Sequence, residues 1–156
     1  MPVTARAFIK ASILYLGLGA LLGALFFLNR WLPVGPALAA LRVSHVQFLV
    51  TGWLTQLILG VAWWLFPPLD IGLRAKGAGP VRRGQAQRGS ERLFWLTFAT
   101  LNLGVLLRAI FEPIYTWTGE PLFLVLVGLS GPLLLVAALA FVVNMWRRVR
   151  ALGRDR

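Results

Sequence analysis

The side chains best suited to chemistry lie in two apolar stretches of the chain. The chain's one histidine, His45, comes one helical turn after Arg42, and Gln56 lies further along the same stretch. In the other stretch Arg108 and Glu112 are four residues apart, a spacing at which opposite charges pair on a helix. A neutral imidazole is a common metal and haem-iron ligand, and arginines bind carboxylates such as haem propionates. These residues therefore predict a ligand site centred on His45.

Other kinds of active site lack their residues. The chain has no cysteine, which excludes thiolate metal sites, iron–sulfur clusters and cysteine nucleophiles. With one histidine and five Asp and Glu residues in all, no hydrolytic constellation can be assembled. The sequence therefore favours a binding or structural protein over an enzyme.

Helical spacing places His45 and Gln56 on one stripe of the second apolar stretch. The stripe consists of His45, Leu49, Gly52, Gln56 and Gly60. Steps of three or four residues share a helix face, and the glycines make this face a groove with room for something flat and bulky, or for another helix. We expect Gly52 and Gln56 to line a pocket beside His45. The alternative is that His45 and Gln56 only hydrogen-bond neighbouring groups, and that Arg108 and Glu112 only pair with each other.

Membrane-spanning helices must hold these residues. Of 156 residues, 58% are hydrophobic and 13% are charged, and the mean hydropathy is +0.76. A soluble domain is about 45–50% apolar and about 25% charged. A span needs about 20 apolar residues, and we place spans at about 8–29, 45–67, 92–115 and 121–146, the third continuing through Arg108.

The predicted fold is all-α, an integral membrane four-helix bundle formed by residues 1–156 as one domain. Basic residues flank the spans mainly on one side: before the first, between the second and third, and after the fourth. Positive residues mark the cytoplasmic side, so both termini are expected in the cytoplasm and His45 near the outer face. Residues 70–91, rich in Gly, Arg and Gln, are expected to form a flexible cytoplasmic loop. The expected location is the inner (plasma) membrane of a prokaryote.

The net charge of +11 is also typical of proteins that bind nucleic acid. Here the basic residues flank apolar spans, and topology together with contact to anionic lipid headgroups explains that placement better. We therefore expect the lipid bilayer, and not nucleic acid, as the partner of this charge.

Part of the chain resembles a known family. Residues 42–53 and 60–67 resemble the second helix of the catalytic subunit of haem–copper oxidases and nitric oxide reductases, and in particular short four-span proteins similar to that subunit. Residues 102–113 are similar to the third span of those short relatives. The resemblance implies that His45 has the position of the low-spin haem ligand. The positions that pack the helix match Gly52, Trp53, Gly60 and Pro67.

The resemblance implies that the protein binds haem b, with His45 as a ligand of the haem iron. The expected role is electron transfer, haem handling or gas sensing. Arg42 and Arg108 are the expected propionate partners. The other haem and copper ligands of the large subunit are missing, so oxygen or nitric oxide reduction is not implied. The iron then has either His45 as its one axial ligand or a second histidine from another chain, as in a two-fold homodimer or a larger respiratory complex. The alternative is a cofactor-free structural or assembly subunit of a membrane respiratory complex.

Overall fold

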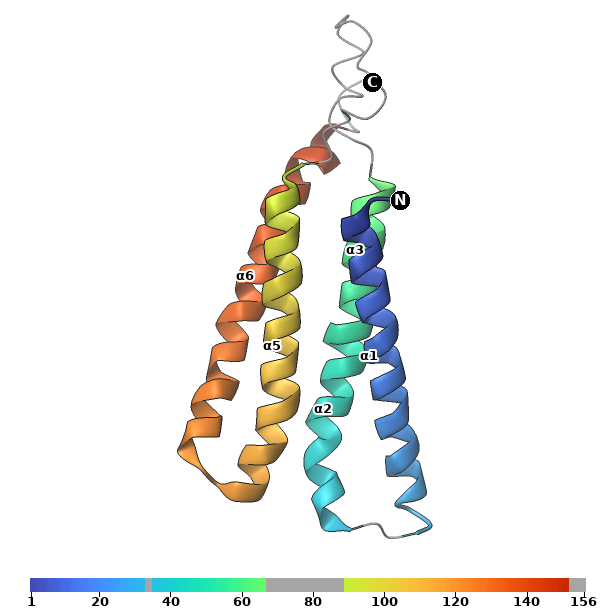
Figure 1. Ribbon diagram of the computed structural model, residues 1–156, viewed down its shortest axis with the longest axis vertical. Coiled ribbons are helices and arrows are strands. Elements are labelled where there is room, and N and C mark those ends of the chain that lie inside the picture. The colour runs from blue at the N-terminus through green and yellow to red at the C-terminus, as the bar shows by residue number, and fades with distance from the viewer. Residues whose placement is uncertain (33–34, 67–88, 152–156) are drawn as a thin grey trace, which may run out of the picture.

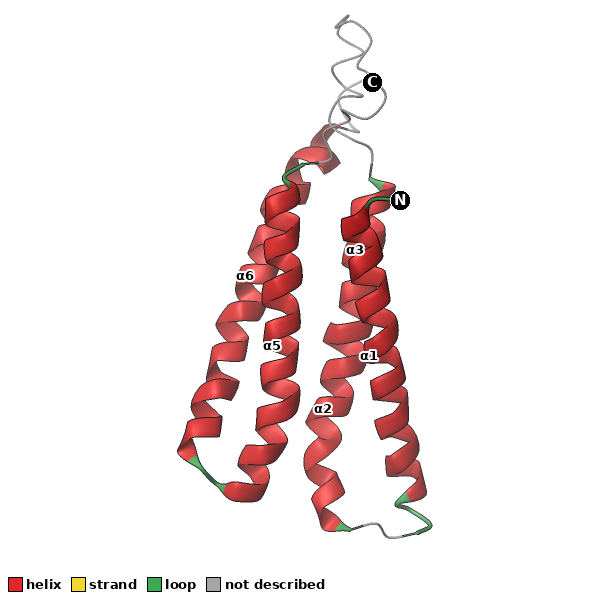
Figure 2. Cartoon of the chain, viewed as in Figure 1, coloured by secondary structure: helices red, strands yellow, loops and turns green. Residues whose placement is uncertain are grey.

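The structure is a computed structural model, and it describes residues 1–32, 35–66 and 89–151. These residues form helices joined by short turns, with no strand among them (Figure 2). The helices are α1 (Val3–Leu28), the 3-10 helix η1 (Pro36–Leu41), α2 (Arg42–Val46), the π-helix η2 (Gln47–Thr55), α3 (Gln56–Leu65), α5 (Glu91–Thr118) and α6 (Pro121–Ala151). The predicted all-α class is confirmed for the described part of the chain.

The helices form two antiparallel hairpins that lie side by side (Figure 1). The continuous run from η1 to α3 returns along α1, and α6 returns along α5. Helix α5 contacts α2 and η2, which joins the two hairpins. We call the two ends of the bundle the terminal end and the loop end. The terminal end carries Val3, Leu65, Glu91 and Ala151, and the loop end carries Leu28, Pro36, Thr118 and Pro121.

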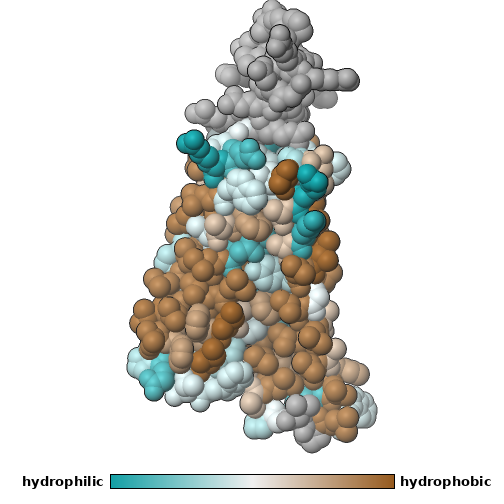
Figure 3. Space-filling view, in the orientation of Figure 1, coloured by the Kyte–Doolittle hydropathy of each residue, from teal (hydrophilic) through white to brown (hydrophobic). Residues whose placement is uncertain are grey.

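Four helical runs are long and apolar enough to cross a membrane. They are Val3–Leu28, Pro36–Leu65, Glu91–Thr118 and Pro121–Trp146. The predicted spans fall on these runs, and the third continues through Arg108 as expected. Pro67, at the end of the second predicted span, and residues 70–88 of the predicted loop lie outside the described residues, whereas Glu91 already belongs to α5. Apolar side chains cover most of the visible face between the two ends (Figure 3).

An aromatic core joins the helices near the terminal end. The ring of Phe94 in α5 stacks on Phe8 of α1, with centroids 4.4 Å apart, and on Trp63 of α3, with centroids 4.2 Å apart. Met145 of α6 belongs to the same buried cluster. Stacked aromatic pairs contribute about 0.5–1.5 kcal/mol beyond the area that they bury, so this cluster holds all four long helical runs together.

The beginning of α5 is set by its own cap and by α6. The Ser90 hydroxyl accepts a hydrogen bond from the Leu93 backbone N–H at 3.3 Å, as an N-cap residue does. Asn144 of α6 holds the Ser90 backbone twice, accepting from its N–H and donating to its carbonyl, each at 2.9 Å. At the other end Gly119, with φ of 71°, closes α5 in the left-handed conformation that favours glycine.

Arg148 of α6 is fully buried and binds the end of α3. Its Nη2 donates to the Trp63 carbonyl oxygen at 3.2 Å and also to the Phe66 carbonyl oxygen. Its guanidinium carbon lies 5.0 Å from the centroid of the Trp63 ring. Carbonyls in the last turn of a helix lack donors within the helix and carry partial negative charge. Arg148 therefore stabilises the end of α3 and links the two hairpins.

Candidate functional site

The glycine stripe of the second helical run faces α1. A Cβ on Gly52 would lie 2.6 Å from Cγ of Tyr15, and a Cβ on Gly60 would lie 2.8 Å from Cβ of Phe8. Side chains of α1 therefore occupy the space that the two glycines leave. The sequence allowed either a flat ligand or another helix in this groove, and the structure places another helix there.

His45 of α2 is half-buried, and its ring lies against α1. Its Nδ1 lies 2.8 Å from the carbonyl oxygen of Gly19, and because a carbonyl only accepts, Nδ1 carries the proton and donates. Gly23 leaves space for the ring, since a Cβ there would lie 3.0 Å from Cε1 of His45. Phe26 meets the imidazole edge-on, with centroids 5.5 Å apart. Two glycines one turn apart in α1 thus accommodate His45 and its hydrogen bond.

The geometry at His45 fits one axial ligand of a haem iron. With the proton on Nδ1, the lone pair is on Nε2, and histidine ligands usually donate their other N–H to a carbonyl or a carboxylate. The glycine groove itself does not fit the macrocycle, because Tyr15 and Phe8 fill the space beside Gly52 and Gly60. A haem bound by His45 would therefore have to lie outside the groove.

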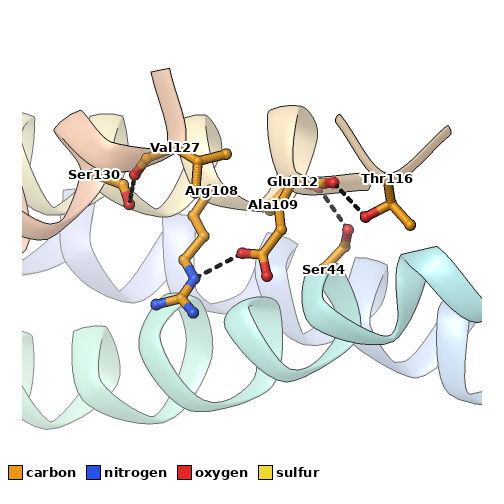
Figure 4. Close-up of polar contacts among 7 residues, drawn as sticks. All are labelled: Ser44, Arg108, Ala109, Glu112, Thr116, Val127 and Ser130. Atoms are coloured by element: carbon orange, nitrogen blue, oxygen red, sulfur yellow. Dashed lines mark hydrogen bonds and ion pairs between the residues drawn. The ribbon is translucent and has the colours of Figure 1, made fainter. Parts of the chain in front are cut away.

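Both predicted arginines lie towards the loop end. Arg42 is the first residue of α2 and is exposed. Arg108 donates from Nε to Oε2 of Glu112 at 2.9 Å, which is the pair that their spacing predicts (Figure 4). Its side chain is 43% exposed. Within the described ranges no hydrogen bond or ion pair joins either arginine to His45, so the structure brings Arg108 together with Glu112 and places His45 against α1.

Ser44 and His45 are neighbours in sequence and contact different helices. The Ser44 hydroxyl is buried and donates to the Ala109 carbonyl oxygen of α5 at 2.6 Å (Figure 4). An apolar cavity of about 320 Å³ lies between α1, α2 and α5, and its lining includes Ser44, Phe48 and Trp117 but not His45. Helix α2 therefore directs His45 away from this cavity and Ser44 towards it.

A partly buried polar network from three helices lies in the middle of the bundle. The Tyr15 hydroxyl of α1 donates to Oδ1 of Asn102 in α5 at 2.9 Å, and Nε2 of Gln56 in α3 lies 3.5 Å from the same oxygen. Asn102 also donates from Nδ2 to the Phe98 carbonyl oxygen at 2.7 Å. The predicted site included Gln56 and omitted Tyr15. The signal that could have found Tyr15 is its hydroxyl group at the middle of the first apolar span.

The chain matches no family model, no curated protein and no solved structure. The likeness of residues 42–53, 60–67 and 102–113 to the oxidase subunit therefore stays a prediction from the sequence. Among the residues that the structure describes, no three His, Asp or Glu side chains are grouped to hold a metal ion.

Proposed function

We propose that the protein is a four-span integral membrane protein with both termini in the cytoplasm of a prokaryote. Four long apolar helical runs support this, as does the common end at which α1 begins and α6 ends (Figure 1). Large apolar side chains such as Leu14 and Val125 are exposed on the outer faces of the bundle. The backbone N–H and C=O groups of a helix are hydrogen-bonded within the helix, so a bilayer can cover such faces without leaving these groups unpaired.

Within this bundle we assign His45 as the axial ligand of a b-type haem, with Nε2 towards the iron. The observation that carries this proposal is the hydrogen bond from Nδ1 to Gly19, because it leaves the Nε2 lone pair available. A bound haem supplies one-electron transfer or gas binding. The exposed guanidinium of Arg42 lies one turn before His45 on the same helix and suits a propionate.

The second axial ligand is a histidine of a second copy of the chain. His45 is the one histidine in the sequence, so a single chain offers the iron one imidazole. A two-fold dimer presents the same residue from both sides of its axis. The expected complex is a dimer that holds one haem between its two chains and has the low-spin spectrum of a haem with two histidine ligands.

We expect the purified protein to show a Soret band after haem is added, and His45→Ala to lose it. His45→Gln is the matched variant, because its amide can still donate to Gly19 although it is a poor iron ligand. Visible absorption measures haem, and thermal unfolding in detergent shows whether each variant is folded. A folded His45→Ala protein with an undiminished Soret band, or a wild type that takes up no haem, would contradict the assignment.

Arg108→Leu should weaken haem binding without preventing membrane insertion, because a propionate partner is lost. Hydrogen bonds to charged groups contribute about 1.5–3 kcal/mol, which corresponds to a rise in the haem Kd of about tenfold or more. Glu112→Gln is the control, since it releases Arg108 from its ion pair and should leave the affinity unchanged or higher. Spectroscopic haem titration measures all three proteins, and equal Kd values for wild type and Arg108→Leu would remove the propionate role.

A cofactor-free structural or assembly subunit of a respiratory complex is the second candidate. It is favoured by the packing of α1 into the glycine groove, and by the fact that the His45 bond to Gly19 already stabilises two helices without a ligand. Under this candidate the wild type takes up no haem and copurifies with a larger membrane complex. The folded His45→Gln variant then copurifies with that complex as well as the wild type does. If the complex depends on haem bound by His45, the variant no longer copurifies with it.

A further inference from the structure

The polar network in the middle of the bundle contains an acceptor without a donor. Gln56 is 0% exposed, and its Oε1 has no hydrogen-bond partner among the described residues. The other end of the amide, Nε2, is 3.5 Å from Asn102 Oδ1, a long contact. An unpaired buried acceptor costs about 1–3 kcal/mol, and more where no water is near, as in hydrocarbon. A hydrogen-bond donor to Gln56 Oε1 would therefore stabilise the bundle.

Groups beside Gln56 complete a small hydrogen-bonding site. The Tyr15 hydroxyl uses its proton on Asn102 and keeps lone pairs that can accept. Asn102 Nδ2 uses one proton on Phe98 and keeps a second. Tyr15 and Gln56 both contact the same Asn102 oxygen, so the side chains that carry these free acceptors and this free donor are direct neighbours. A molecule that fits there needs both donors and an acceptor.

We propose that Gln56, Asn102 and Tyr15 bind an internal water molecule midway through the bundle. Water is the smallest molecule with two donors and an acceptor, and buried waters typically make about three hydrogen bonds to otherwise unpaired groups. Tyr15 is at the midpoint of α1 and Asn102 is close to the midpoint of α5. The site is therefore distant from both ends of the bundle, and it involves neither His45 nor its haem.

The π-helix next to Gln56 supports this site. Helix η2 ends at Thr55, and π-turns are rare and often accompany functional sites. The Thr55 hydroxyl donates to the Val50 carbonyl oxygen, five residues back, at 2.9 Å. Gly52, within η2, allows the Tyr15 ring to lie directly against the helix, on the side that carries Gln56. Gln47, the first residue of η2, has the other buried side-chain oxygen that lacks a partner in the described part.

Hydroxyl-radical labelling by X-ray irradiation tests the proposal, because radicals made from a bound water oxidise the side chains next to it. The full chain in detergent is irradiated, and oxidation is located by mass spectrometry. We expect oxidation of Tyr15, although it is 6% exposed, and none of Phe94, which lies in the apolar core at 0%. Irradiation after a short exposure to ¹⁸O-water should place the heavy isotope on Tyr15.

Gln56→Leu removes the unpaired acceptor and should lower Tyr15 oxidation to the level of Phe94. Thr100→Val is the matched control, since it removes a hydroxyl of α5 that donates to its own helix and should leave Tyr15 oxidation unchanged. Wild-type Tyr15 that is oxidised no more than Phe94 would overturn the proposal, even if Gln56→Leu fails to fold. Undiminished Tyr15 oxidation in folded Gln56→Leu would overturn it as well.

Discussion

Gly52→Ala is expected to destabilise the protein by about 2–4 kcal/mol. The new Cβ would lie 2.6 Å from Cγ and 2.9 Å from Cβ of Tyr15, and these atoms are too close to the backbone of α1 to move aside alone. Overpacking of this kind costs about 1–3 kcal/mol. Displacing Tyr15 also breaks its bond to Asn102, and such a bond inside a membrane bundle is worth about 1 kcal/mol.

Gly17→Ala and Gly128→Ala are the matched controls for Gly52→Ala. Neither glycine has an atom within 4 Å of an added Cβ, and alanine is favoured over glycine within a helix by about 0.5–1 kcal/mol. Both controls should therefore be neutral or more stable than wild type. Thermal unfolding in detergent, followed by tryptophan fluorescence, measures the difference, and a Gly52→Ala midpoint equal to that of the controls would disprove the close packing of α1.

Arg148→Met is expected to cost about 2–3 kcal/mol in the same unfolding measurement. Methionine keeps the apolar contacts of the stem but leaves the carbonyls of Trp63 and Phe66 without the donor that now reaches them. Each hydrogen bond to a charged group is worth about 1.5–3 kcal/mol, and removal of the buried charge returns part of this by ending its desolvation penalty. The loss of the two hydrogen bonds outweighs the desolvation energy that is recovered, because carbonyls at a helix end have no donor within the helix.

Arg92→Met is the control for Arg148→Met. Arg92 is exposed in the first turn of α5, at the same end of the bundle. Its substitution removes one positive charge from this end, as Arg148→Met does, and should change stability by less than about 0.5 kcal/mol. If the two variants unfold at the same temperature, the bonds of Arg148 to α3 contribute nothing and its importance is limited to membrane topology.

The helical spans could be predicted because length and charge decide them. The third apolar run is interrupted by Arg108, yet the helix continues through it, and Glu112 one turn later pairs with that arginine. The stripe through Gly52 was also predictable, since helical periodicity identifies a shared face. Periodicity does not identify the partner of that face, and so the sequence left open whether a ligand or α1 would fill it.

Other features depend on contacts between residues far apart in sequence. In the sequence, Arg148 is only one of the positive charges that predict topology. Its hydrogen bonds to α3 form because α6 ends close to the end of that helix. Tyr15 and Asn102 are 87 positions apart, and nothing local to either predicts their pairing. The π-helix does not follow from the sequence pattern, because stripes at 3.6 residues per turn describe an α-helix, whereas each turn of η2 contains more residues.

The contact between Arg148 and α3 has a consequence for biogenesis. In the proposed membrane topology α3 is synthesised well before α6, so the first hairpin would meet the lipid before the guanidinium of Arg148 reaches the carbonyls of Trp63 and Phe66. Until then, water or headgroups at the membrane surface must solvate them. The bonds of Arg148 therefore form in a late step of assembly, at an end of the bundle where Phe94 of α5 can already pack on Phe8 and Trp63.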